Sequence, residues 1–119
     1  MEVVPDDFSL IEDRLLHFVE EHCDLILTTG GTGLTPDDLT PEASRAVIER
    51  EAPGIAEALR TESAKYTPAG ILSRGVAGIC AQTLIVNLPG SPKAIEQLFG
   101  VLAPVLPHAV ATLRGDSAH

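Results

Sequence analysis

The chain has 119 residues, of which 45% are hydrophobic, and a formal net charge of −9. This length and apolar content suit one compact domain over 1–119 and exclude a disordered chain, while no apolar run approaches the roughly 20 residues of a membrane-spanning helix. The acidic excess disfavours nucleic acid as a partner, because phosphate backbones are bound through basic surfaces.

The first part of the chain predicts a helix and a buried strand. Glu2–Val4 has the composition of a short strand remnant, and the Pro-Asp-Asp turn after it opens a helix. Apolar residues at helical spacing extend that helix from Phe8 to about Glu21. The uninterrupted apolar run Leu25–Leu27 is typical of a strand buried on both faces of a parallel sheet.

The middle of the chain predicts two helices and a short strand. We expect Thr40 to cap a helix that has Pro41 at its first position and runs to about Glu51. Pro53 starts a second helix, whose apolar residues again recur at helical spacing. Val76–Ile79 is a candidate for a short strand.

The last part begins with the clearest strand pattern, at Thr83–Val86. A helical apolar pattern follows from Ile95, and Pro104 and Pro107 inside it predict two helices or a kink. We expect a flexible tail over Gly115–His119.

Strands that alternate with helices predict the α/β class, as a three-layer sandwich with a mostly parallel central sheet. Ligands of such sheets bind at the carboxyl ends of strands, where both glycine-bearing motifs lie. Cys23 and Cys80 form no CxxC pair, so we expect free buried thiols and a cytoplasmic protein without a signal peptide.

The first motif is the run Thr28-Thr29-Gly30-Gly31-Thr32-Gly33. Its glycines permit positive φ and close approach of a ligand, and successive backbone N–H groups there can form an anion-binding nest. A tight turn after a strand explains the same glycines, and the pattern alone leaves both interpretations open. It matches neither GxGxxG nor a P-loop.

The second motif is the acidic stretch Asp37–Glu42. Asp38 either holds a metal or a ring N–H of a ligand, or makes an Asx-turn that fixes its loop. We interpret Asp37 as a solvated loop acid and Glu42 as an acid that stabilises a helix N-terminus.

The third motif, Asn87-Leu88-Pro89-Gly90-Ser91-Pro92, joins the clearest strand to a helix. It is either a phosphate cradle at a helix start or a rigid turn. Arg74 and Lys93 flank these loops and serve either as phosphate ligands or as surface charges. Ser73 has no base within sequence reach, so it is no candidate nucleophile, and the histidines show no metal-ligand spacing.

Together and in this order, the motifs resemble the MogA/MoaB-type molybdenum-cofactor biosynthesis domain, which also occurs in gephyrin-like proteins. The resemblance extends over nearly the whole chain. The matching stretches are Val4–Asp7, Leu25–Gly33, Asp38 with Thr40–Glu42, Leu72–Arg74 and Leu84–Pro92.

The resemblance implies a three-layer α/β domain that assembles as a homotrimer and works with other proteins of molybdenum-cofactor biosynthesis. It implies that the chain binds molybdopterin and transfers AMP from ATP to its terminal phosphate, with Mg²⁺ and release of pyrophosphate. Asp6 and Asp38 match the family's two important acidic positions, with Asp38 also a candidate Mg²⁺ ligand. The expected substrate-binding residues are Thr29, Gly30, Gly31, Thr32, Gly33, Ser73, Arg74, Asn87, Pro89, Gly90, Ser91 and Lys93.

Two departures from the family pattern stand out. Family members carry a further segment before the stretch that corresponds to Glu2, and it supplies a strand, a helix and a polar loop; we therefore expect an N-terminally shortened domain with an exposed sheet edge. Asp37 stands where many members have a basic or neutral residue, which weakens anion binding unless a metal offsets it.

Three hypotheses follow. The first is a molybdopterin adenylyltransferase. The alternative is a non-catalytic trimeric molybdopterin-binding or scaffold protein of MoaB type, and the third is an α/β fragment that does not fold by itself.

Overall fold

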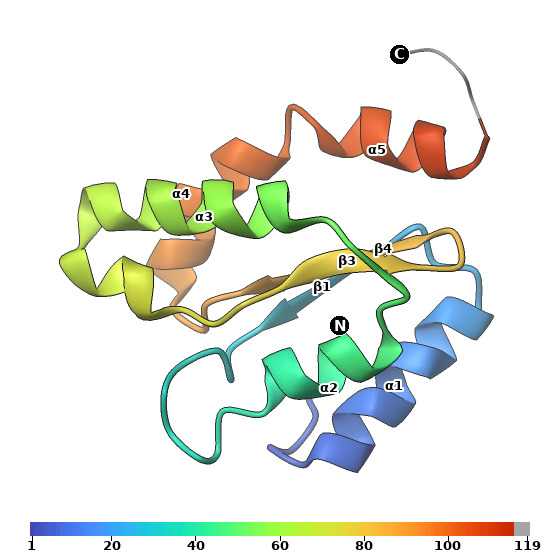
Figure 1. Cartoon of the computed structure of the whole chain (residues 1–119), viewed down its shortest axis with the longest axis horizontal. Helices are drawn as coiled ribbons and strands as arrows, with labels where there is room; N and C mark the ends of the chain where they lie inside the picture. The colour runs from blue at the N-terminus through green and yellow to red at the C-terminus, as the bar shows by residue number, and fades with distance from the viewer. Residues whose placement is uncertain (116–119) are drawn as a thin grey trace.

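A four-stranded sheet forms the middle layer of the molecule, with its strands in the order β1-β4-β3-β2 (Figure 1). The structure is a computed structural model that describes residues 1–115, so the predicted tail lies outside the described residues except for Gly115. The strands are β1 (Leu25–Thr29), β2 (Arg50–Glu51), β3 (Ala77–Cys80) and β4 (Thr83–Leu88).

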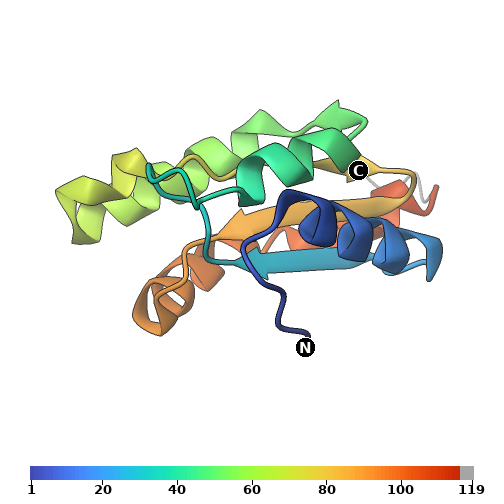
Figure 2. The ribbon, with the colours of Figure 1, turned by 90° about the horizontal axis from the view of Figure 1, so that it is seen from below.

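Helices cover both faces of this sheet, as Figures 1 and 2 show from two directions. Helices α3, α4 and α5 lie on one face, and α1 and α2 lie on the other. Their bounds are α1 (Phe8–Glu20), α2 (Thr40–Val47), α3 (Pro53–Tyr66), α4 (Pro92–Leu102) and α5 (Leu106–Leu113), with a 3-10 turn, η1, at Pro68–Leu72. The predicted α/β class and three layers are confirmed.

Strand β4 separates two hydrophobic cores, because its successive side chains point to opposite faces. Leu84, Val86 and Leu88 pack into the larger core with α3 and α4. Ile85, which is fully buried, packs into the smaller core with Leu15 of α1. Every residue of β4 is buried, which explains its apolar run Leu84–Val86.

The prediction that the sheet is mostly parallel is wrong. Only β1 and β4 run parallel, whereas β3 pairs antiparallel with both β4 and β2. Cys80 pairs with Thr83, so Ala81 and Gln82 alone form the hairpin turn between β3 and β4. A parallel pair needs a crossover of a dozen or more residues, so this spacing permits only a hairpin. The turn lacks the Asn-Gly pattern that signals a hairpin, and Ala81 adopts φ +53°.

Two further element boundaries differ from the sequence prediction. Helix α2 ends at Val47 rather than near Glu51, because the chain turns extended there and pairs with β3 as β2. No strand forms at Glu2–Val4. Instead the Glu2 carboxylate accepts two hydrogen bonds from the Arg14 guanidinium, at 2.6 and 2.7 Å, which tie the start of the chain to α1.

Other expectations hold. The first helix and the helix at Pro53 begin where predicted, and the two prolines of the last helical pattern divide it into α4 and α5, bent by 64°. Cys23 and Cys80 are free thiols as expected, but only Cys80 is buried, and Cys23 is partly exposed. Within residues 1–115 no single helix is long and apolar enough to cross a membrane. Helices α4 and α5 meet the length and composition of such a span only when they are taken together, and they are bent by 64° relative to each other.

Candidate functional site

The two glycine-bearing loops meet at one end of the sheet. Because β1 and β4 run parallel, their carboxyl ends lie at the same edge, and Thr29 pairs with Leu88. The Gly30 amide donates to the Leu88 carbonyl over 2.9 Å. A Cβ built on Gly90 would lie 3.3 Å from the Cα of Gly30, so the two loop backbones are in contact. The arrangement gives one site built from two loops.

The first loop needs glycine for its shape. Gly30 and Gly31 have φ values of +87° and +68°, in the left-handed region that other residues rarely adopt. The Gly31 carbonyl accepts a 3.2 Å hydrogen bond from the Thr40 amide. A Cβ on Gly31 would come within 2.3 Å of the Thr40 Oγ1. The loop is therefore folded tightly against the start of α2.

Arg74 joins three parts of this loop region from a distant part of the chain. Its Nε donates to the Gly33 carbonyl over 2.7 Å, and Nη2 donates to the Asp38 carbonyl over 2.6 Å. Nη1 and Nη2 contact the two carboxylate oxygens of Glu42 at 2.6 and 3.2 Å. The Arg74 amide also donates to the Thr32 carbonyl. The guanidinium thus contacts protein oxygens on several sides, while 34% of the side chain stays exposed.

The Asp38 carboxylate closes its own loop. Its Oδ2 accepts from the Thr35 amide at 3.0 Å and from the Thr35 Oγ1 at 2.8 Å. The predicted Asx-turn would hold a residue after Asp38, whereas the observed bonds reach back to a residue before it. Asp38 therefore fixes its loop, as one of the two interpretations predicted, but through Thr35 before it rather than through a residue after it.

Hydrogen bonds keep the acids of this region ionised. Bonds from the Thr35 hydroxyl and amide lower the pKa of Asp38, and the Gly33 backbone and the charge of Arg74 lower it further. The hydrogen bond from Arg74 lowers the pKa of Glu42 and, in return, raises the pKa of Arg74 itself. At neutral pH the region therefore carries fixed charges.

Asn87, an expected substrate-binding residue, is buried and bonded within the protein. Its Oδ1 accepts from the Val76 amide at 3.0 Å. Its Nδ2 donates to the Thr28 Oγ1 at 2.8 Å and to the Ser44 Oγ at 3.0 Å. With 4% of its surface exposed, it fixes the end of β4 below the second loop.

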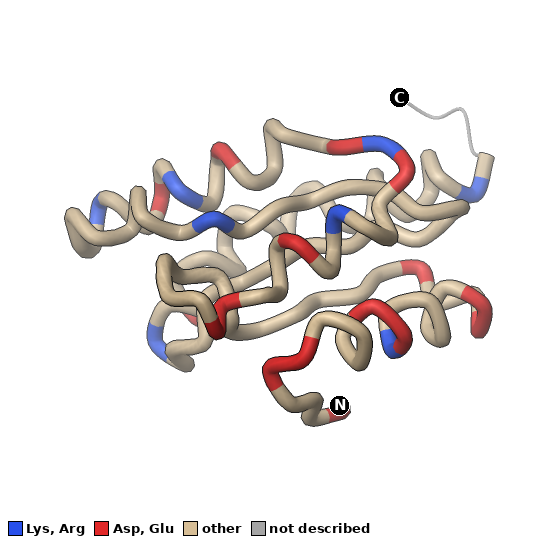
Figure 3. Tube along the Cα trace, turned by 60° about the horizontal axis from the view of Figure 1, so that its bottom comes forward, with Lys and Arg blue, Asp and Glu red and all other residues tan. Residues whose placement is uncertain are grey.

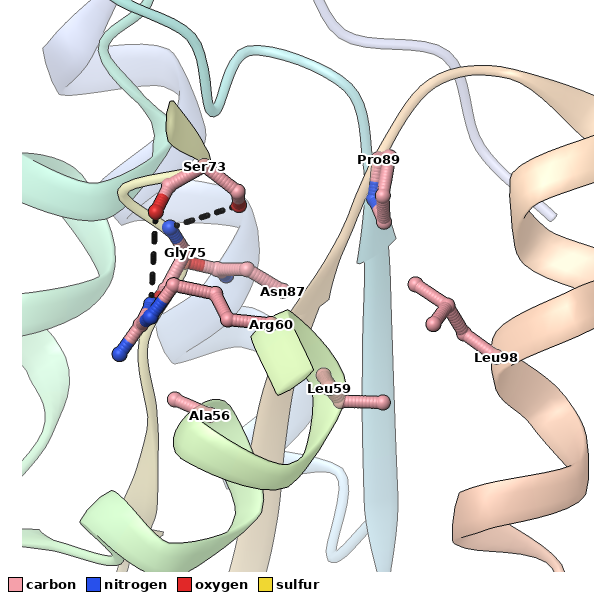
Figure 4. A pocket seen from close by; sticks show the side chains of 8 residues that line it. All are labelled: Ala56, Leu59, Arg60, Ser73, Gly75, Asn87, Pro89 and Leu98. Atoms are coloured by element: carbon pink, nitrogen blue, oxygen red, sulfur yellow. Dashed lines mark hydrogen bonds between the residues drawn. The ribbon is translucent and has the colours of Figure 1, made fainter. Parts of the chain in front are cut away.

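Ser73, Asn87 and Pro89 line a small cavity between α3 and α4 (Figure 4). Its volume is about 10 Å³, enough for about one water molecule. The Arg60 Nη1 donates to the carbonyls of Gly75 and Ser73 at 2.8 and 3.4 Å. Sequence reasoning missed Arg60, although its position four residues after the buried Ala56 places it on the inward face of α3.

A much larger cleft of about 630 Å³ opens beside β1. Its volume lies in the range of small-molecule sites. It is lined by α1, β1, the chain start and four of the expected site residues, which are Asp6, Thr29, Gly30 and Gly31. Asp38 does not line this cleft. The two predicted acids therefore lie at different places, with Asp6 in the cleft and Asp38 beside Gly33 of the first glycine loop.

The second loop has few side-chain contacts. Ser91 caps α4 by accepting a hydrogen bond from the Ala94 amide at 3.4 Å, and Pro92 is the first residue of the helix. Lys93 is exposed in the first helical turn. The basic residues lie at separate positions along the chain trace, as Figure 3 shows. The amide groups at the α4 N-terminus give this loop a positive end.

No cluster of three or more His, Cys, Asp or Glu side chains suited to a metal occurs within residues 1–115. Mg²⁺ that arrives with a nucleotide needs only one or two carboxylates besides the phosphates. Asp38, ionised and next to the first glycine loop, fits that role by its chemistry.

Comparisons with known proteins agree on one family. The family described as a probable molybdopterin binding domain matches residues 1–108. The molybdopterin adenylyltransferase of Helicobacter pylori strain J99 is 44% identical over 116 residues, which cover 97% of this chain and 66% of that protein. The Escherichia coli K12 enzyme of the same name is 48% identical over 96 residues, 80% of this chain and 49% of the relative.

Solved structures give the same result. The molybdopterin biosynthesis enzyme MoaB from Thermus thermophilus superimposes with a TM-score of 0.87 at 50% sequence identity, covering 94% of this chain and 71% of that one. The chain spans between about half and two thirds of the two bacterial adenylyltransferases. A match over residues 1–108, with the same fold and the two adjoining glycine loops, shows that the chain belongs to the family of probable molybdopterin-binding domains of molybdenum-cofactor biosynthesis.

Proposed function

We propose that the chain binds molybdopterin and transfers AMP from ATP to its terminal phosphate, releasing pyrophosphate. The observation that carries this proposal is the contact between Gly30 and Gly90 at the carboxyl ends of β1 and β4, beside a cleft that also contains Asp6. Two phosphate-binding loops that touch suit a reaction that joins two phosphate-bearing substrates. Relatives at 44% and 48% identity are named for this activity.

The two loops would divide the work of binding. The loop Thr29–Gly33 would hold one substrate through backbone N–H groups, as its left-handed glycines favour an anion nest. The loop Gly90–Ser91 and the first turn of α4 with Lys93 would hold the second through the helix N-terminus. Ser73, Arg74, Asn87 and Pro89, which the resemblance also implied, would then act behind the loops.

The transfer step is a displacement at phosphorus. A terminal phosphate oxygen of molybdopterin forms a bond to the α-phosphorus of ATP, the bond from that phosphorus to the β-phosphate bridge breaks, and pyrophosphate leaves. Mg²⁺ bound with ATP would neutralise phosphate charge, with Asp38 as its protein ligand. Backbone N–H groups of the loops would stabilise the charge that develops. Mg²⁺ and backbone N–H groups would thus allow a chain of net charge −9 to bind an anionic ligand.

The test is a turnover assay with the purified chain, molybdopterin, ATP and Mg²⁺, in which adenylylated product is separated by chromatography. We expect product with the wild type and a loss of about a hundredfold or more in Asp6→Asn, because the acid lies in the cleft. Asp13→Asn is the matched control, because Asp13 is an exposed acid of α1 that does not line the cleft. A wild type without product, in a sample that unfolds cooperatively, would refute the proposed transfer.

A second candidate is a non-catalytic, trimeric binding or scaffold protein. One observation favours assembly: Tyr66, Ile71 and Leu72, at the end of α3 and in η1, are 54%, 67% and 49% exposed. Grouped apolar side chains of this kind mark interaction surfaces. Sedimentation of the wild type and of Ile71→Asp would test it, and a monomer at all concentrations would exclude this candidate.

A further inference from the structure

We propose that Arg74 and Glu42 form a positioning clamp that holds the loop Gly33–Asp38 in its active shape, so that Arg74 acts through the loop and does not itself bind phosphate. The inference rests on the proposed adenylyl transfer and assigns it a further pair of residues. It replaces a role for Arg74 as a substrate ligand, which the sequence pattern left open and the family resemblance implied.

The donors of Arg74 are committed to the protein. Of the five N–H groups of a guanidinium, four take part in contacts with the Gly33 carbonyl, the Asp38 carbonyl and both carboxylate oxygens of Glu42. A phosphate that bound Arg74 would have to compete with a carboxylate at 2.6 Å and would meet the negative charge of Glu42. Both features disfavour direct contact with an anionic substrate.

The positions of the accepting oxygens explain what the clamp does. Gly33 and Asp38 bracket the loop, and Arg74 holds one carbonyl at each end of it. Glu42 fixes the guanidinium to the first turn of α2, and the Arg74 amide bonds to Thr32. The Asp38 carboxylate is oriented inside this frame by Thr35. Loss of the frame would move Asp38 and the last glycine of the first loop together.

Only a planar, branched cation satisfies these partners at once. The oxygens lie around a fork of three nitrogens, whereas lysine offers one ammonium group. Arg74→Lys therefore keeps the positive charge and loses the clamp. A phosphate-binding cation would behave differently, because lysine is itself a good phosphate ligand.

The experiment combines kinetics with amide hydrogen exchange on the full chain. The variants are Arg74→Lys, Glu42→Ala and the double variant, and Arg45→Gln is the control, because Arg45 lies on the same helix in an exposed pair with Glu51 at 3.7 Å. Far-UV circular dichroism melts verify that each variant folds. Exchange over residues 33–38 is followed without any ligand, and kcat and KM for ATP are measured with molybdopterin and Mg²⁺.

The clamp predicts that both single variants exchange residues 33–38 about tenfold faster and lose about tenfold or more in kcat with little change in KM. The double variant should be no worse than Arg74→Lys, since the two residues act as a unit. Arg45→Gln should match the wild type. Retention of activity in Arg74→Lys, or unchanged or improved activity in Glu42→Ala, would overturn the clamp in favour of direct phosphate binding.

The exchange measurement separates this inference from the proposed function. If the wild type makes no adenylylated product, the adenylyl transfer fails, while unchanged exchange in Arg74→Lys would still refute the clamp. If exchange rises but kcat stays the same, Arg74 stabilises the loop without positioning anything for the reaction, and the proposal is overturned.

Discussion

The two loops of the site are built in different ways. The first, Thr28–Gly33, is held by backbone bonds to Leu88 and Thr40 and by Arg74. The second, Pro89–Ser91, depends on the Ser91 cap and on its contact with Gly30. Backbone that is fixed from several sides keeps its shape before a ligand arrives, and backbone with few contacts adjusts. The difference indicates a preformed first cradle and an adaptable second one.

The largest expected effect comes from adding one methyl group to the first loop, and the same change in the second loop serves as the comparison. Gly31→Ala should destabilise the protein by about 2 to 4 kcal/mol, because φ is +68° and the new Cβ would meet Thr40. Gly90→Ala should cost about 1 kcal/mol, since its Cβ would lie 3.3 Å from the Gly30 backbone and φ is not positive. Urea unfolding measures both. Equal losses would remove the proposed contrast between the loops.

A smaller effect is expected from acid pH, and it should fall on the first loop. Asp38 and Glu42 have lowered pKa values in the folded state, through bonds from Thr35 and Arg74 respectively. Their stabilisation is therefore present above the unfolded pKa of about 4 and is lost as pH falls through the lower, folded pKa values. In thermal melts between pH 7 and pH 3, the melting temperature of Thr35→Val should fall less steeply with pH than that of the wild type. Parallel curves for the two proteins would contradict this account of Asp38.

The smallest effect is expected in the second loop. Ser91→Ala removes a helix cap whose hydrogen bond is long, at 3.4 Å, so it should cost about 0.5 kcal/mol, at the low end for caps. Urea unfolding again gives the change in stability. A loss above about 2 kcal/mol would show that the second loop is as firmly held as the first.

Much of the fold was predictable from local patterns. The apolar spacing located α1 and α3, the run before the first glycines located β1, and the proline pair divided α4 from α5. The spacing of Cys80 and Thr83 also permitted only a hairpin, so the antiparallel pairing was within reach of sequence reasoning. The Ala81-Gln82 turn carried none of the usual hairpin residues, and the pairing was therefore predicted wrongly.

The sequence by itself determined that two glycine loops follow two apolar strands and so adjoin at the carboxyl end of a sheet, because strand period and turn chemistry are local properties. The predicted burial of the first strand on both faces was wrong, because β1 is an edge strand in which only Ile26 is buried. Only the tertiary structure decided what the polar residues do. Arg74 and Glu42 are 32 residues apart, and Asn87 and Ser44 are 43 apart. Such partners are selected by packing of distant segments, which satisfies buried donors and acceptors that no local pattern reveals.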